Sequence, residues 1–357
     1  MEENEEKTPN TPEQVSGNSS EDQQTKEETS QETSFAAHQP SQDYIWLAGQ
    51  VNNVKGAIKS YIIGQEELVE LLVAGIFCSG HILLEGVPGV AKTLASKVLA
   101  KALDVDFSRI QFTPDLMPSD VIGTSVFNMK ESTFSFKKGP VFSNIVLIDE
   151  INRAPAKTQA ALFEVMEERQ ITYDGQRYVM GTPFIVIATQ NPIEQEGTYN
   201  LPEAQLDRFL FKINLDYPDL ADEIEILSRF KSKEKLKTIE TIQPVLKSAD
   251  IQKIQGIVDA VKVEENIIKY IALLTNKTRT HHQIYLGASP RGSLAILNSA
   301  KAVAAIRGRD FITPDDVQYV TPHVLNHRLI LTPEAEMEGV KAVDVIAEII
   351  KEVEVPR

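Results

Sequence analysis

The chain has 357 residues, of which 42% are hydrophobic and 7% aromatic, and its formal net charge is −15. That length can bury the cores of two domains, whereas the acidic balance argues against a general affinity for nucleic acid. No membrane-spanning run or signal peptide is recognisable and the single cysteine, Cys78, excludes an internal disulfide, so we expect a cytoplasmic protein without membrane insertion.

The first segment of the chain is strongly acidic. Residues 1–40 hold ten Asp or Glu and two Lys, and almost no large apolar side chains. Because such a segment cannot offset the entropy cost of ordering, we predict a disordered acidic tail over residues 1–42, which serves either solubility or docking. Apolar positions at helical spacing then predict a helix over residues 44–61 and, after Gly64, another over residues 66–79.

The run from Leu83 to Thr93 predicts a buried strand, a glycine-bearing loop and a helix that opens on Lys-Thr. It matches the phosphate-binding loop, except that Ala91 replaces the second glycine. We expect Ala91 to begin the helix, where a negative φ is normal. The loop amides and the helix N-terminus would face the phosphates, Lys92 would bind the β- and γ-phosphates, and the Thr93 hydroxyl would ligate Mg²⁺. The residues expected to hold the nucleotide here are Gly86, Val87, Pro88, Gly89, Val90, Ala91, Lys92, Thr93 and Leu94.

A second apolar strand, residues 144–150, ends in two carboxylates, Asp149 and Glu150. Continuous apolar runs are typical of buried parallel strands, and ligands collect at the carboxyl ends of such strands. We therefore expect Asp149 to hold the Mg²⁺ shell and Glu150 to polarise a water against the γ-phosphate. A third apolar run, residues 183–188, leads to Asn191, which could hydrogen-bond the γ-phosphate or its water; a turn-forming Asn-Pro is the alternative.

Five segments resemble, in the family's order, the MoxR group of AAA+ ATPases: GVPGVAKT, VLIDEINRAP, LFEVMEERQITYDGQ, ATQNPIEQEGTYNLPEAQLDRF and GASPRGSLAIL. The resemblance covers residue 44 to the C-terminus. It implies a P-loop α/β domain with a parallel sheet over residues 43–217 and a smaller all-α lid domain over residues 218–357. It also implies that Ile63 and Gly64 line the adenine pocket through backbone and apolar contacts, although a plain helix-joining turn is the alternative.

Two arginines take their roles from the resemblance. Arg208, in LPEAQLDRF, corresponds to an arginine finger that acts on the ATP of a neighbouring subunit; a cation that stabilises a helix C-terminus is the alternative. Arg291 follows a Ser-Pro helix start and resembles sensor 2, directed toward the phosphates; a solvent-exposed arginine after an N-cap is the alternative. Residues 113–142 and the hairpin predicted around Asp174-Gly175 resemble inserts that face the pore of such rings and act on a client, or else they are decorated loops.

The sequence therefore predicts an ATPase that assembles into a ring, with a hexamer as the expected form. Its cofactors would be ATP and Mg²⁺. The resemblance implies chaperone-like remodelling or maturation of client protein complexes, including metal insertion, alongside von Willebrand A domain proteins. A nucleotide-binding scaffold without hydrolysis and a DNA-associated ring are the alternatives. Intact Glu150 and Arg208 argue against the first, and the acidic charge and missing DNA-binding module argue against the second.

Overall fold

The computed structural model describes residues 41–87, 89–130, 132–192, 198–231 and 239–356. Residues 40–357 form one compact unit, so the domain boundary predicted between residues 217 and 218 lies inside a packed body and stays a prediction. Pro88 and the predicted acidic tail lie outside the described residues, except that Gln42 already begins helix α1 (Gln42–Lys59). In the part of the chain that is described, no helix is long and apolar enough to cross a membrane.

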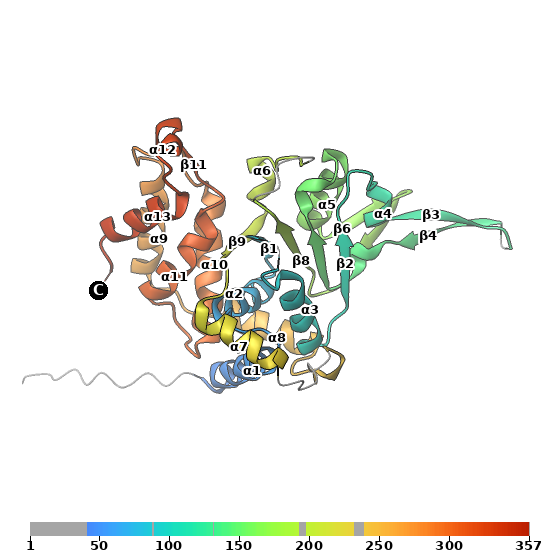
Figure 1. The fold of residues 1–357 in the computed structure, drawn as a ribbon, viewed down its shortest axis with the longest axis horizontal. Helices are drawn as coiled ribbons and strands as arrows, with labels where there is room; N and C mark the ends of the chain where they lie inside the picture. The colour runs from blue at the N-terminus through green and yellow to red at the C-terminus, as the bar shows by residue number, and fades with distance from the viewer. Residues whose placement is uncertain (1–40, 88, 131, 193–197, 232–238, 357) are drawn as a thin grey trace, which may run out of the picture. The chain divides into compact units, whose positions relative to one another are not determined.

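Five parallel strands form the central sheet in the order β2-β5-β8-β1-β9 (Figure 1). The strands are β1 (His81–Gly86), β2 (Phe107–Gln111), β5 (Ile145–Asp149), β8 (Ile185–Gln190) and β9 (Phe209–Leu215). Their register aligns Leu147 with Ile187 and Ile187 with Ile82. All five strands therefore end along one side of the sheet, the carboxyl edge, and begin along the other, the amino edge.

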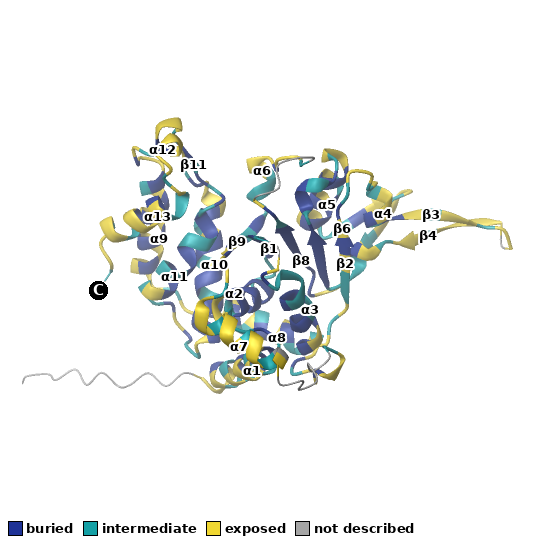
Figure 2. Ribbon diagram, viewed as in Figure 1, coloured by how far each residue is buried: buried dark blue, intermediate teal, exposed yellow. Residues whose placement is uncertain are grey.

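Helices cover both faces of the sheet, because its strands bury side chains on both sides. Ile145 and Leu147 of β5 enter one hydrophobic core and the alternate residues, Val146 and Ile148, enter a second one. Helices α2 and α3 pack into the first core and α5 into the second, and Figure 2 shows the strands buried between them. The helices are α2 (Glu66–Phe77), α3 (Lys92–Ala102) and α5 (Ala156–Glu168).

The C-terminal part is almost entirely helical, as the sequence predicts. Its elements are α7 (Leu220–Lys231), α8 (Ser248–Asp259), α9 (Glu265–Thr278), β10 (Ile284–Leu286), α10 (Pro290–Ile306), α11 (Pro314–Leu325), β11 (Ile330–Leu331), α12 (Pro333–Met337) and α13 (Ala342–Glu352). Helix α11 starts at Pro314 after the N-cap Thr313, whose N–H donates to the Asp316 carboxylate at 2.9 Å. The fold class, a parallel-sheet α/β domain followed by a helical lid, is confirmed.

Two hairpins interrupt the α/β domain. Their elements, with two short helices, are α4 (Pro118–Ile122), β3 (Gly123–Asn128), β4 (Thr133–Lys138), β6 (Gln170–Tyr173), β7 (Gln176–Val179) and α6 (Glu203–Leu206). The β3–β4 hairpin extends away from the sheet (Figure 1). The predicted turn at Asp174-Gly175 is present, with positive φ at both residues (48° and 76°), as a tight two-residue hairpin requires. Phe136 of β4 packs on Tyr173 and Tyr178, with ring centroids 4.8 and 4.6 Å away, so the two hairpins support each other.

Candidate nucleotide-binding site

The phosphate loop leaves the sheet at the carboxyl edge, between β1 and α3. The Lys92 ammonium group donates a hydrogen bond to the Gly86 carbonyl oxygen at 2.6 Å, so its side chain lies across the loop. Gly86 is required by packing, because a Cβ on it would stand 2.6 Å from the Leu215 carbonyl oxygen. Thr93 lies in the first turn of α3. The loop thus brings a cation and a hydroxyl group to a helix N-terminus, which is suited to an anionic ligand.

The backbone at Ala91 corrects the sequence prediction. Helix α3 begins at Lys92, and Ala91 precedes it with φ 59° and ψ 19°, in the left-handed region rather than with the negative φ we expected. An alternation of right- and left-handed residues turns successive amide groups toward one point, which makes an anion-binding concavity. The general motif has glycine at this position because only glycine adopts such a conformation without strain. An alanine there costs roughly 1–2 kcal/mol.

Asp149 ends β5 at the carboxyl edge and is only 6% exposed. Its Oδ2 accepts a hydrogen bond from the Arg109 Nε at 2.5 Å, and its Oδ1 accepts one from the Thr189 hydroxyl at 3.3 Å. A largely buried carboxylate that already binds a cation can also bind a metal ion, and its oxygens, with the Thr93 hydroxyl, are the hard ligands that Mg²⁺ prefers. The residues present therefore fit the metal predicted from the sequence.

Glu150 follows directly and has an unusual backbone, with φ 57°. Left-handed φ at a residue other than glycine costs about 1–3 kcal/mol and clusters at functional sites. The Glu150 carboxylate accepts a hydrogen bond from the Gln111 Nε2 at 2.8 Å and lies 3.0 Å from the Arg153 Nε. The Glu150 N–H donates to the Thr189 hydroxyl at 3.0 Å. These contacts hold the carboxylate at the carboxyl edge, beside Asp149.

Sequence reasoning missed Arg109 and Gln111. Both belong to β2, at alternate positions, so their side chains point to the same side of the sheet. They reach Asp149 and Glu150 because β2 pairs with β5. Two polar side chains two residues apart near the end of a strand could have marked them as candidates. The order of the strands was needed to show that they lie beside the two carboxylates.

Asn191 also reaches this edge. It follows β8, which lies between β5 and β1 in the sheet. The register aligns Ala188 with Ile148 and Gln190 with Glu85, so Asn191 lies level with the end of β1. Its side chain is buried. The structure therefore brings the amide of Asn191 to the same edge as the two carboxylates and the phosphate loop.

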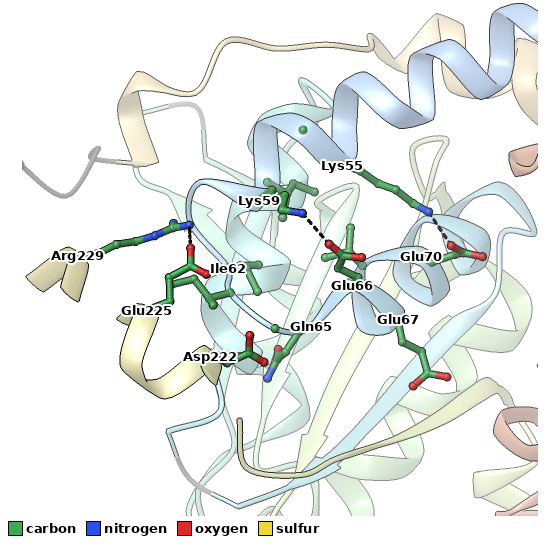
Figure 3. A pocket seen from close by; sticks show the side chains of 15 residues that line it. Lys55, Lys59, Ile62, Gln65, Glu66, Glu67, Glu70, Asp222, Glu225 and Arg229 are labelled. Atoms are coloured by element: carbon green, nitrogen blue, oxygen red, sulfur yellow. Dashed lines mark hydrogen bonds and ion pairs between the residues drawn. The ribbon is translucent and has the colours of Figure 1, made fainter. Parts of the chain in front are cut away.

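A pocket of about 670 Å³ lies beside the predicted adenine segment, between the end of α1, the start of α2 and α7 (Figure 3). Gly64 has φ 73°, and a Cβ on it would stand 1.8 Å from a carboxylate oxygen of Asp222 on α7, so glycine is required twice over. Gln65 donates a hydrogen bond from its Nε2 to the Val90 carbonyl oxygen at 3.0 Å, which links this segment to the phosphate loop. Ile63 lies on the pocket wall.

The charged side chains of this pocket are mostly acidic. Figure 3 shows the ion pairs Lys55–Glu70, Lys59–Glu66 and Arg229–Glu225 around it. Two further carboxylates, Glu67 and Asp222, also line it. Desolvation and the neighbouring carboxylates of Asp219 and Glu225 raise the pKa of Asp222 above its ordinary value. An excess of negative charge disfavours phosphate here, so the lining suits an uncharged ring such as a purine.

Arg208 lies at the opposite side of the sheet, the amino edge. It directly precedes β9, whose first residue, Phe209, is aligned with His81 at the start of β1. Because β1 has six residues, the amino edge is about 17 Å from the phosphate loop. Arg208 places its Nε 3.0 Å from the Glu167 carboxylate and lies over the Phe163 ring, 5.9 Å from its centroid.

The position of Arg291 corrects a second prediction. Its guanidinium lies 3.3 Å from the Glu167 Oε1 and 3.9 Å from the Asp207 Oδ2, at the amino edge, and not toward the phosphates of its own chain. The reason is tertiary packing. Helix α11 and the residues after it bind the start of β9, for instance through the Arg328 Nε, which is 2.7 Å from the Asp207 Oδ1. This packing brings the first turn of α10 over the end of α5.

The sheet order, the phosphate loop at one edge and the paired carboxylates beside it define an ATPase of the AAA class. A family model described as "ATPase family associated with various cellular activities (AAA)" matches residues 81–211, and a model of the AAA lid domain matches residues 276–349. The first model lies within the α/β domain and the second within the helical part, which agrees with the observed fold.

Similar proteins narrow the class. YeaC of Bacillus subtilis is 48% identical over 299 residues, which are 84% of this chain and 92% of that protein. The chaperone MoxR1 of Mycobacterium tuberculosis is 44% identical over 323 residues, 87% of this chain and 84% of that protein. A crystal structure of a protein from Cytophaga hutchinsonii, described as an ATPase, is 42% identical with a TM-score of 0.82 and covers 88% of this chain and 97% of its own. The chain belongs to the MoxR family of AAA ATPases.

Proposed function

We propose that this ATPase hydrolyses ATP together with Mg²⁺ at the carboxyl edge of its sheet and works as a ring that remodels client proteins. The observation that carries the proposal is the pair Asp149 and Glu150, of which the first already binds a guanidinium and the second is held beside it. ATP would lie with its base against Ile63 and Gly64 and its phosphates on the loop at Gly86–Thr93. The hydrogen bond from Gln65 to Val90 keeps the two halves of this binding surface together.

Each residue at this edge has one task in the proposed reaction. Lys92 exchanges the Gly86 carbonyl for the β- and γ-phosphates, and Thr93 with Asp149 holds the metal. When bound, Mg²⁺ would supply positive charge that offsets the charge of the phosphates. Glu150 accepts a proton from, and orients, the water that attacks in line, and Asn191 donates a hydrogen bond to the γ-phosphate. Catalysis of this kind is mainly positioning and electrostatic stabilisation.

The residues at the amino edge of the sheet are the reason for proposing a ring. Arg208 and Arg291 lie at the end of the strands opposite to the phosphate loop, so neither serves the ATP of its own chain in this arrangement. In a closed ring of identical subunits, one surface of each subunit faces a different surface of the next, and we propose that the amino edge faces the neighbour's carboxyl edge. Arg208 then acts as an arginine finger and Arg291 as sensor 2 on the neighbour's ATP. We propose a hexamer.

A chaperone-like role is proposed from a relative and from the hairpins. The relative from Mycobacterium tuberculosis is named a chaperone. Four large apolar side chains on β3, β4 and the turn between them are exposed, among them Met129 and Phe134 at 88% and 72%, which is the kind of surface that binds other proteins. We propose that clients, including complexes that receive a metal, are engaged there in the cytoplasm, together with von Willebrand A domain proteins.

Two other functions make different predictions. A scaffold without hydrolysis would bind ATP at the same site but would not need Glu150. A DNA-associated ring would bind DNA in a salt-dependent way, and the net charge of −15 argues against it. Among the residues that the structure describes, no specific contact at either edge of the sheet favours one of these alternatives.

The experiment compares Lys92→Ala and Glu150→Gln with the wild type. We expect Lys92→Ala to lose ATP binding, because a charge and a phosphate contact are removed together. Glu150→Gln should bind ATP but scarcely hydrolyse it. In the presence of ATP, Glu150→Gln should also retain client proteins that Lys92→Ala does not retain. Glu334→Gln, which changes an exposed carboxylate of α12, serves as the control. Near-normal hydrolysis by Glu150→Gln would contradict the proposal.

A further inference from the structure

Glu167 joins two arginines that come from different parts of the chain. It lies in the last turn of α5, at the amino edge. Its Oε2 is 3.0 Å from the Arg208 Nε, and its Oε1 accepts a hydrogen bond from the Arg291 Nη2 at 3.3 Å. Arg208 belongs to the α/β domain and Arg291 to the first turn of α10. One carboxylate, with one oxygen for each guanidinium, thus bridges the finger arginine and the arginine of the lid.

A second carboxylate, Asp207, attaches the helical part to the sheet, a task that Glu167 does not have. Asp207 binds Arg328, whose side chain is only 4% exposed and which also donates to the carbonyl oxygens of Phe209 and Leu210 at 2.6 and 3.3 Å. These buried bonds attach the helical part to the start of β9. Arg291 is 60% exposed and its contacts are longer. Holding the lid is therefore the task of Arg328, and the bridge through Glu167 has another purpose.

The bridge leaves both arginines able to bind a further anion. A guanidinium has five N–H donors, so an ion pair through the Nε of Arg208 does not exhaust it. The guanidiniums of Arg208, Arg291 and Arg328 are paired with only two carboxylates, Glu167 and Asp207, so an excess of positive charge remains. Without the carboxylate between them, the two like charges would repel each other. The Phe163 ring supports Arg208 from below. The cluster is thus ordered before any anion arrives.

We propose that Glu167 is a positioning residue that holds Arg208 and Arg291 as one unit, so that finger and lid arginine reach the neighbouring subunit's triphosphate together. The inference rests on the proposed function of these two arginines across the ring interface. The lid position of one subunit is then communicated through Glu167 to the reaction in the next subunit. A triphosphate oxygen displaces neither contact of Glu167. It binds the two guanidiniums in addition to that carboxylate.

The test uses the full chain with Glu167→Gln, which keeps the shape of the side chain and removes its charge. We expect kcat of the assembled ring to fall by about 10-fold to 10²-fold, as expected for a misplaced catalytic group. The affinity for a fluorescent ATP analogue and the melting temperature should stay at the wild-type value, because Glu167 touches neither the phosphate loop nor the Arg328 anchor. Glu164 is also exposed and lies one turn earlier on the same face of α5. Glu164→Gln is therefore the matched control and should behave as the wild type.

Two further measurements separate positioning from a structural role. In a double-mutant cycle, Arg291→Ala should cost much less in kcat when Glu167 is already Gln, because the bridge is gone. In mixed rings, Glu167→Gln subunits should complement Glu150→Gln subunits, since an interface with intact Glu150 on one side and intact Glu167 on the other is restored. Additive losses, or mixed rings that never regain activity while they exchange subunits, would overturn the proposal. Glu167→Asp, which keeps the charge, replaces Glu167→Gln if the latter fails to fold.

The failure of this inference can be told apart from failure of the proposed function. If Arg208→Ala hydrolyses ATP at the wild-type rate, the finger itself is wrong and the bridge has no catalytic purpose. If Arg208→Ala is inactive while Glu167→Gln equals the wild type in kcat, the finger stands and the positioning role of Glu167 is wrong.

Discussion

The two edges of the central sheet differ in how their functional groups are held. At the carboxyl edge, the phosphate loop, Asp149 and Glu150 are tied to backbone groups and to strands on both sides, as the bonds Lys92–Gly86 and Arg109–Asp149 show. At the amino edge, Arg208 and Arg291 are tied to a carboxylate by side-chain contacts that are partly exposed to solvent.

This difference indicates a division of tasks. The carboxyl edge has the groups that we propose bind a nucleotide within one chain, and most of them are half-buried or buried. The amino edge has cations that no phosphate of the same chain can reach, since the length of β1 separates the two edges. In the proposed ring, a single chain therefore carries two halves of different sites. The variants below test this division.

The largest effect is expected at the amino edge. Arg208→Ala should retain ATP binding but lose hydrolysis, because its guanidinium would stabilise charge on the neighbour's γ-phosphate. Arginine fingers are worth roughly 10³–10⁵-fold in rate. Single-turnover hydrolysis with a parallel binding measurement checks this. Lys351→Ala, which removes an exposed positive charge near the end of α13, is the control for the loss of a positive charge.

A mixing experiment sharpens the same comparison. Subunits with Arg208→Ala and subunits with Glu150→Gln are each inactive alone, but some interfaces of a mixed ring pair intact Glu150 with intact Arg208. Activity should partly return. If it does not, at concentrations where rings form and exchange subunits, then Arg208 acts within its own chain and the two edges do not belong to different sites.

A smaller effect is expected from Arg109→Ala at the carboxyl edge. In the described structure the guanidinium neutralises Asp149, so a metal ion must compete with it for that carboxylate. Removing Arg109 should lower the melting temperature without metal and should make the protein gain more stability from Mg²⁺ alone. Thermal unfolding over a range of Mg²⁺ concentrations, without nucleotide, measures both. Arg109→Lys, which keeps the charge, should have a melting temperature and a Mg²⁺ dependence between those of the wild type and Arg109→Ala. Identical Mg²⁺ dependence in all three proteins would show that Arg109 does not compete with the metal.

Acid should weaken the amino edge through His81. Burial, with the nearby charge of Arg169, lowers the pKa of His81 to about 4. Its Nδ1 accepts the Val186 N–H at 2.9 Å and its Nε2 faces the Met166 carbonyl oxygen at 3.1 Å, so the folded protein holds it neutral. The unfolded chain takes up a proton near pH 6.5. The stabilisation is therefore complete above pH 6.5 and is lost as the pH falls toward 4.

The size of this loss is about 3 kcal/mol for one histidine, by linkage of protonation to folding. Denaturant unfolding between pH 7 and pH 4 checks it. His81→Gln should make the pH profile less steep, with the remaining slope coming in part from His327, whose pKa burial also lowers, whereas His282→Gln, at an exposed position, should leave it unchanged. A His81→Gln profile with the wild-type slope would contradict the assignment of the acid sensitivity to this side chain.

The smallest effect concerns the phosphate loop itself. Ala91→Gly should stabilise the fold by about 1 kcal/mol, because glycine adopts the left-handed backbone without strain. Ala95→Gly, in the helical interior of α3, should destabilise it by a similar amount. Opposite signs of the two changes in unfolding free energy would support the backbone assignment. Two destabilising changes would mean that the methyl group of Ala91 contributes packing that outweighs the strain.

Much of the carboxyl edge could be predicted from the sequence. The order of strand, loop and helix around Lys92, and the apolar strand that ends in Asp149 and Glu150, are local patterns whose chemistry depends on neighbours in the chain. The hairpin turn at Asp174-Gly175 follows from its turn residues in the same way, and the helical lid was implied by the family resemblance. The backbone of Ala91 was predicted wrongly, because the shape of the loop, rather than the helix propensity of the residue, sets its φ.

The sequence by itself determined the fold class, the nucleotide loop and the two carboxylates, since these depend on residues a few positions apart. Only the tertiary structure decided which side chains complete each edge. Arg109 reaches Asp149 because β2 pairs with β5, and Arg291 reaches Glu167, 124 positions away in the chain, because the buried contacts of Arg328 bring α10 over α5. Such contacts come from the packing of whole elements, and no local pattern of residues encodes them.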